Sequence, residues 1–155
     1  METGTSEATP LAPALIKDGV SISRPHENLP WLPPSGTVWH VEAGTHFDAI
    51  RARRTLGQAA LALLGAASGA VICDPWSRIH YFLTEPSSTT GWDVRETTVC
   101  GTATYVVVPP LDSVAMHLHW AVPPVPDRLF TPTGQLRQTL LAAVEAHFGP
   151  RARQR

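Results

Sequence analysis

Between residues 37 and 122 the chain is a succession of short β-like runs separated by turn residues, and this pattern restricts the fold most strongly. Each run is rich in β-branched or aromatic residues and is bounded by glycine, proline or other turn formers, which is typical of strands. The expected strands span residues 37–42, 45–51, 69–73, 79–83, 97–100, 104–108 and 116–122. Asp74-Pro75-Trp76-Ser77-Arg78 has the composition of a hairpin turn.

Two segments have helical periodicity instead. Residues 56–64 place apolar side chains on one stripe and end at Gly65, while residues 136–148 do the same and end at Gly149-Pro150. We therefore predict an α+β domain over residues 35–149, with a single mainly antiparallel or mixed β-sheet packed with two main helices. Residues 150–155 are predicted to form a basic C-terminal tail.

The first 34 residues hold many Pro, Ser, Thr and Glu residues without a sustained period, which predicts a disordered proline-rich N-terminal tail. Within this tail, Leu29-Pro30-Trp31-Leu32-Pro33-Pro34 resembles an extended segment that lays an aromatic ring on the domain surface. A contact between the tail and a protein partner is a second interpretation, which the sequence leaves open.

Composition limits the partners and the compartment. The formal net charge is −1, so a nucleic acid could be held only by a local basic patch. No run approaches the roughly 18 apolar residues that span a bilayer, and the chain does not start like a signal peptide, so we expect a cytoplasmic protein with no membrane partner. Cys73 and Cys100 are predicted to be small core side chains rather than a disulfide or zinc ligands.

Several short segments occur in an order that resembles a known family. They are Gly44-Thr45-His46-Phe47-Asp48-Ala49-Ile50, the segment from Ser68 to Pro75, Tyr81-Phe82-Leu83-Thr84-Glu85-Pro86, the run from Gly101 to Pro110, and His119-Trp120. Together they resemble the actinobacterial domains related to bifunctional DNA primase/polymerase. The resemblance implies an archaeo-eukaryotic primase-like fold that binds nucleotides and a divalent metal and, in active members, extends primers.

The chain departs from that family at the positions that matter for catalysis. Asp48 is a single acid, because Ile50 stands where a second carboxylate would be needed to hold two metal ions. Tyr105 and Val107 occupy the strand on which a nucleotide-contacting histidine would be expected. The resemblance therefore implies a degenerate, noncatalytic relative in which His46 and Asp48 contact a nucleotide or nucleic acid.

Arginines supply the best candidate for an anion site. Arg51, Arg53 and Arg54 are expected to follow a strand and open a helix, where guanidinium groups and free backbone N–H groups can hold a phosphate together. The segment Gly65-Ala66-Ala67-Ser68-Gly69 does not add a phosphate loop, because it lacks the Gly-Lys-Ser/Thr ending of a Walker sequence.

Two histidines supply a candidate metal site. His117 and His119 are two residues apart on an expected strand, so both imidazoles would project from one face, and a third ligand would come from Asp48, His46 or His80. The alternative is a polar, solvated face of the sheet.

Three hypotheses follow from these residues. The first is a noncatalytic primase/polymerase-like module that binds nucleotide, nucleic acid or a replication-linked partner. The second is a small interaction or regulatory protein that uses its tail and loops. The third is an enzyme that depends on a divalent metal held by His117 and His119.

Overall fold

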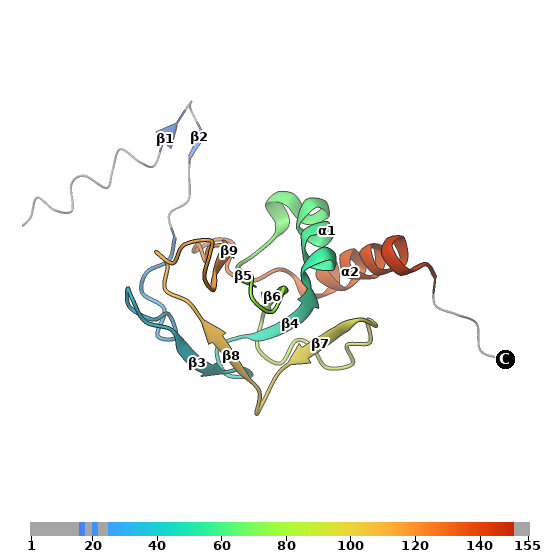
Figure 1. The fold of residues 1–155 in the computed structure, drawn as a ribbon, viewed down its shortest axis with the longest axis horizontal. Helices are drawn as coiled ribbons and strands as arrows, with labels where there is room; N and C mark the ends of the chain where they lie inside the picture. Colours follow the sequence, from blue (N-terminus) through green and yellow to red (C-terminus); the bar gives the residue numbers. More distant parts are fainter. Residues whose placement is uncertain (1–15, 18–19, 22–24, 151–155) are drawn as a thin grey trace, which may run out of the picture.

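The computed structural model describes residues 16–17, 20–21 and 25–150, so most of the predicted N-terminal tail and the end of the C-terminal tail lie outside the described residues (Figure 1). The elements in chain order are β1 (Ile16–Lys17), β2 (Val20–Ser21), β3 (Trp39–Glu42), β4 (Asp48–Arg53), α1 (Arg54–Leu64), the short 3₁₀ helix η2 (Gly65–Ala67), β5 (Val71–Asp74), β6 (Ile79–Thr84), β7 (Thr97–Cys100), β8 (Tyr105–Val108), β9 (His119–Val122) and α2 (Thr133–Phe148). None of the helices in this described part is long and apolar enough to cross a bilayer.

The main sheet has five strands in the order β7-β4-β6-β5-β9, and every neighbouring pair is antiparallel. β3 and β8 form a separate antiparallel pair, as do β1 and β2. The prediction of an α+β fold with a mainly antiparallel sheet and two main helices is confirmed, while the β3–β8 pair lies outside the single sheet that was expected.

Both helices lie on one face of the main sheet and pack against each other (Figure 1). Alternation along β4 directs Ile50 and Ala52 toward them, and these residues share a core with Leu56 of α1 and Leu140 of α2. Phe82 of β6 is fully buried in the same core.

A second core lies on the opposite face of the main sheet. Phe47, Ala49 and Leu83 pack there against Val106 and Val108 of β8. Trp31 is also buried in this core, with 4% of its surface exposed, so part of the segment that the sequence assigns to the tail belongs to the folded domain. The β3–β8 pair and this segment cover the part of the face around Ala49 and Leu83, whereas Arg51, Arg53 and Thr98 on the rest of it are exposed, and we call this part the open half of the face.

Candidate functional site

The structure corrects the predicted location of the three arginines. Arg51 and Arg53 lie on β4 itself, and only Arg54 opens α1. The strand starts at Asp48 rather than Thr45 because the chain turns tightly before it, with Gly44 at a φ of 102° and its N–H donating to the Phe47 carbonyl. β4 then continues through Arg53, two residues past the expected end.

A fourth arginine joins these three, and the sequence reasoning missed it. Arg78 ends the turn between β5 and β6, where its backbone has a φ of 60°, a conformation that favours glycine. The carbonyl of Arg78 accepts a hydrogen bond of 2.8 Å from the N–H of Arg54, which fixes the hairpin to the start of α1. We call Arg51, Arg53, Arg54 and Arg78 the arginine track.

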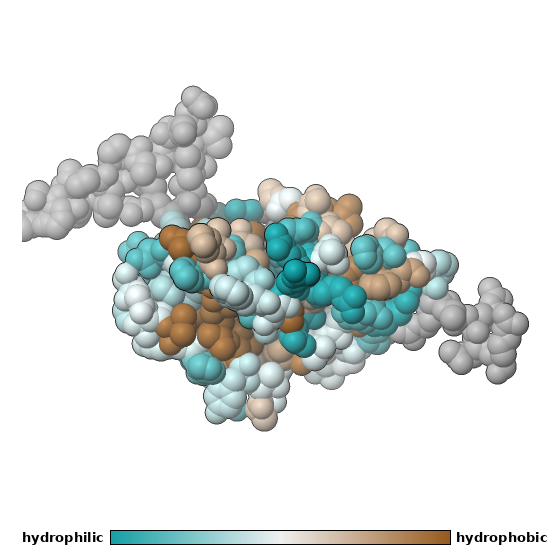
Figure 2. All heavy atoms as spheres, viewed as in Figure 1, coloured by the Kyte–Doolittle hydropathy of each residue, from teal (hydrophilic) through white to brown (hydrophobic). Residues whose placement is uncertain are grey.

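The arginine track connects two neighbouring hollows. One, of about 460 Å³, lies on the open half of the sheet face and is lined by Arg51, Thr98 and Glu96 among others. The second, of about 560 Å³, lies beside the start of α1 and is lined by Arg54, Gln58 and His147 among others. Arg53 and Arg78 line both hollows, so the two hollows adjoin at these residues. Figure 2 shows a strongly hydrophilic surface over the end of β4 and the start of α1.

Little negative charge neutralises the arginine track. Among the described residues, Glu96 is the only carboxylate that forms an ion pair with it, at 3.3 Å from Arg53, and the guanidinium of Arg53 also lies 5.5 Å from the centre of the Phe148 ring. The first turn of α1 contains no acidic residue and no capping side chain. Positive charge at a helix N-terminus is unfavourable unless an anion binds, so this end of the domain is suited to an anionic ligand.

Asp48 and His46 do not join the arginine track. Asp48 is 3% exposed and points to the helix side of the sheet, opposite to Arg51, where its Oδ2 accepts a 2.6 Å hydrogen bond from the Thr89 hydroxyl. Its Oδ1 and the hydroxyl of the paired Thr84 are buried and have no hydrogen-bond partner among the described residues. His46 is exposed beside Trp31 and Trp39 on another part of the surface.

The two candidate metal ligands are also arranged differently from the prediction. β9 begins only at His119, so His117 lies in the preceding loop, and the His119 ring nitrogen Nδ1 lies 2.8 Å from the carbonyl oxygen of His117. No group of three or more His, Cys, Asp or Glu side chains in the described part of the chain has a geometry that could hold a metal ion.

The two cysteines are separate core thiols, as predicted. Both are buried and free, and they face opposite sides of the sheet, because Cys100 packs in the Trp31 core while Cys73 is paired with His80 on the helix side. Burial raises the pKa of both thiols, against the opposing charges of Arg54 near Cys73 and Arg51 near Cys100. A thiol with a raised pKa is a poor nucleophile near neutral pH.

His80 is a buried histidine beneath α1. Its side chain is 3% exposed, and a Cβ added to Gly57 of α1 would lie 2.7 Å from the His80 ring. Burial, assisted by the electrostatic effects of the neighbouring Arg54 and His119, lowers the pKa of His80 to about 4. The imidazole is therefore neutral in the folded protein at physiological pH.

The low pKa of His80 predicts a loss of stability in mild acid. Between the ordinary histidine pKa of about 6.5 and the folded value of about 4, the unfolded chain binds a proton that the folded chain does not. The free energy of unfolding should fall by about 2 kcal/mol between roughly pH 7 and pH 5, and His80→Gln should remove most of this slope. Urea unfolding at both pH values measures this change in the free energy of unfolding. An equal change between the two pH values in wild type and variant would contradict the assignment to His80.

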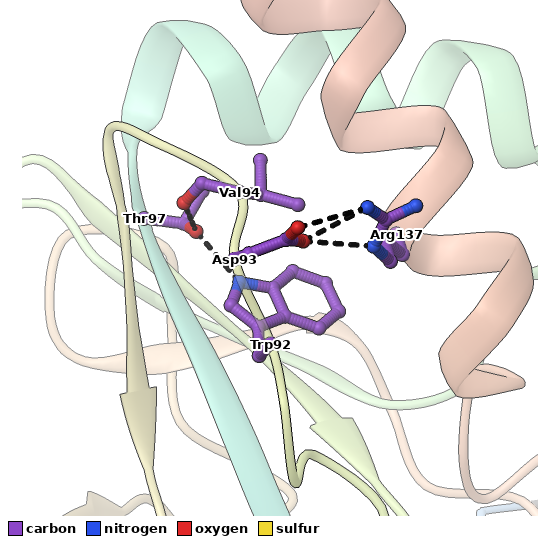
Figure 3. A network of polar contacts seen from close by, with 5 residues as sticks. All are labelled: Trp92, Asp93, Val94, Thr97 and Arg137. Atoms are coloured by element: carbon purple, nitrogen blue, oxygen red, sulfur yellow. Dashed lines mark hydrogen bonds and ion pairs between the residues drawn. The ribbon is translucent and has the colours of Figure 1, made fainter.

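The loop that follows β6 is fixed to α2 by polar contacts (Figure 3). Arg137 of α2 forms two hydrogen bonds with the carboxylate of Asp93, at 2.9 and 3.2 Å. The indole N–H of Trp92 donates to the Thr97 hydroxyl at 2.8 Å, and that hydroxyl donates to the Val94 carbonyl. Trp92 therefore covers the edge of the helix-side core. Asp93 forms an ion pair with Arg137 that attaches the loop to α2.

Comparison of the chain with protein-family models, with curated proteins and with solved structures gives no match in any of the three.

Proposed function

We propose that this protein is a noncatalytic module that binds the phosphate backbone of a nucleic acid along the arginine track. The observation that carries the proposal is the convergence of four arginines from β4, α1 and the β5–β6 turn on two connected hollows, with a single paired carboxylate among the described residues. Guanidinium groups match phosphate oxygens in geometry and charge. Arginines spread over two adjoining hollows suit a polymer with repeated phosphates better than a single small anion.

Nucleic-acid binding is also what the primase-like resemblance implies, but Asp48 has no role in phosphoryl transfer in this proposal. A carboxylate that holds a catalytic metal has to face the bound nucleotide. Asp48 is instead buried on the face opposite Arg51 and is hydrogen-bonded to Thr89. Binding without catalysis is therefore the function that these residues support.

Neutralising the arginine track should weaken DNA binding and reduce its salt dependence. Each phosphate contact contributes about 0.7 to 0.9 to the slope of log affinity against log salt, so Arg51→Gln and Arg78→Gly should each lower the slope by about that amount. The Arg78→Gly variant will remain folded, because glycine accepts the φ of 60° without strain. Fluorescence anisotropy of labelled oligonucleotides at several salt concentrations measures both effects.

Arg128→Gln is the matched control for these variants. Arg128 is exposed and its side chain donates to the carbonyl of Ala66, beyond the opposite end of α1 from the arginine track. Its loss should leave affinity and salt slope unchanged. Binding that is independent of salt, or equally weakened by all three substitutions, would contradict the proposal.

A protein contact is the second candidate function. The loops on either side of the β3–β8 pair expose Val38, Val114 and Met116, of which Met116 is 78% exposed. Val38 and Val114 line a common hollow of about 350 Å³. If the wild-type protein binds no nucleic acid, this apolar group of side chains becomes the better candidate site.

A further inference from the structure

The tip of the β5–β6 hairpin presents an exposed tryptophan. Trp76 is 82% exposed, the highest value among the exposed large hydrophobic side chains of the described residues. The other four tryptophans are covered to a much greater degree, from 4% exposure at Trp31 to 39% at Trp39. An indole ring left in water forgoes a large burial energy, and such rings are frequent where proteins contact a ligand.

The turn that carries Trp76 is held in a defined shape. The side-chain oxygen Oδ1 of Asp74 accepts hydrogen bonds from the backbone N–H groups of Trp76 and Ser77, both at 3.1 Å. The other end of the turn is attached to α1 through the hydrogen bond from the Arg54 N–H to the Arg78 carbonyl. Trp76 is therefore exposed on a backbone that is already ordered, which lowers the entropic cost of binding a ligand.

Trp76 is also adjacent to the arginine track. Ser77 lines the sheet-face hollow, and Arg78 lines both hollows. Trp76 directly precedes these two residues in the chain, so it belongs to the same turn as residues that line the proposed phosphate path. A single-stranded nucleic acid offers a phosphate and an unpaired base side by side, whereas a duplex encloses the faces of its bases in the stack. Aromatic stacking on a base is worth about 1–3 kcal/mol and tolerates any sequence.

We infer that the ligand of the arginine track is single-stranded nucleic acid and that Trp76 stacks on one of its bases while the arginines hold the adjoining phosphates. This inference rests on the proposed function, and it adds the strand state of the ligand and the residue that selects it.

The test compares three ligands of equal length: oligothymidylate, oligouridylate and a DNA duplex. Wild-type protein should bind a single strand more tightly than the duplex, and Trp76→Ala should weaken single-strand binding about tenfold while leaving duplex binding unchanged. Trp76→Phe should retain part of the affinity, and Trp76→Leu should not, because leucine supplies apolar area without a ring. Leu63→Ala, which removes a 63% exposed leucine from α1, is the matched control and should have no effect.

The possible results distinguish a failure of this inference from a failure of the proposed function. Tighter binding of oligothymidylate identifies DNA as the ligand and tighter binding of oligouridylate identifies RNA, and either result supports the inference if it depends on Trp76. Equal binding of single strand and duplex, or a Trp76→Ala variant that binds all ligands like wild type, overturns the inference and leaves the arginine track as a phosphate site. Failure of the wild-type protein to bind any of the three overturns both.

Discussion

Replacing Trp31 with alanine is expected to lower the free energy of unfolding by about 3 to 5 kcal/mol, the usual cost of removing a large buried aromatic side chain. The Trp31 ring is 4% exposed and meets the Phe47 ring edge-on, with the ring centres 5.0 Å apart and the planes at 71°. It also lies 6.2 Å from the Trp120 ring. Its removal would open a cavity between the main sheet and the segment that precedes β3.

Urea unfolding measured by circular dichroism tests this prediction. Trp76→Ala is the matched control, because the same substitution at an 82% exposed position should change stability by no more than about 0.5 kcal/mol. Deletion of residues 1–34, the span that the sequence predicts to be a tail, should destabilise the domain at least as much as Trp31→Ala. A loss below about 1 kcal/mol for Trp31→Ala would show that the segment is not part of the folded unit.

Local patterns were sufficient to predict most elements of the main sheet and both helices. β7 has the predicted bounds, β6 extends one residue further, and β5 begins two residues and ends one residue later than predicted. Outside the main sheet, β8 begins one residue later than predicted. Helical spacing before Gly149, whose φ is 81°, likewise predicted the end of α2. These features depend on a few neighbouring residues, namely side-chain alternation, turn formers and capping glycines, and so can be inferred from the sequence.

Pairings between distant segments could not be predicted in the same way. β3 is followed in sequence by β4 but pairs with β8, more than sixty residues away, because the turn at Gly44 directs the chain into a different layer. The proline-rich segment around Trp31 predicted an aromatic ring on the domain surface, but its burial in a core with Phe47 and Trp120 depends on contacts with distant segments. Tertiary contacts decide both features.

The candidate site was predicted only in part, again because tertiary contacts complete it. Three of the four arginines are close together in the sequence, so they could be recognised as a group, but Arg78 joins them only through the pairing of β4 with β6, in which Arg53 lies opposite Ile79, and the Arg54 hydrogen bond. Alternation along β4 separates Asp48 from Arg51, since residues three apart on a strand face opposite sides. The available signal for Arg78 was its position at the end of an Asp-Pro turn that also carries an unexplained tryptophan.

Gly69→Ala is expected to destabilise the protein by about 3 kcal/mol or more, the upper range for overpacking. A Cβ at this position would lie 2.3 Å from the carbonyl carbon of Phe130 and 2.5 Å from the backbone nitrogen of Thr131. These neighbours are backbone atoms held in place, because Thr131 Oγ1 accepts a hydrogen bond from the Gly69 N–H while the Thr131 N–H donates to the Leu83 carbonyl. They cannot move without breaking hydrogen bonds between the sheet and the segment that leads into α2.

Gly134→Ala tests whether this cost arises from the close contact rather than from glycine itself. Gly134 lies in α2, and a Cβ there would meet no atom within 4 Å, so alanine should raise stability by about 0.5 kcal/mol through its higher helix propensity. Thermal unfolding of the two variants should therefore shift in opposite directions. Equal effects would contradict the packing explanation. Opposite shifts would show that Gly69 is required for the close contact between the sheet and the segment that leads into α2.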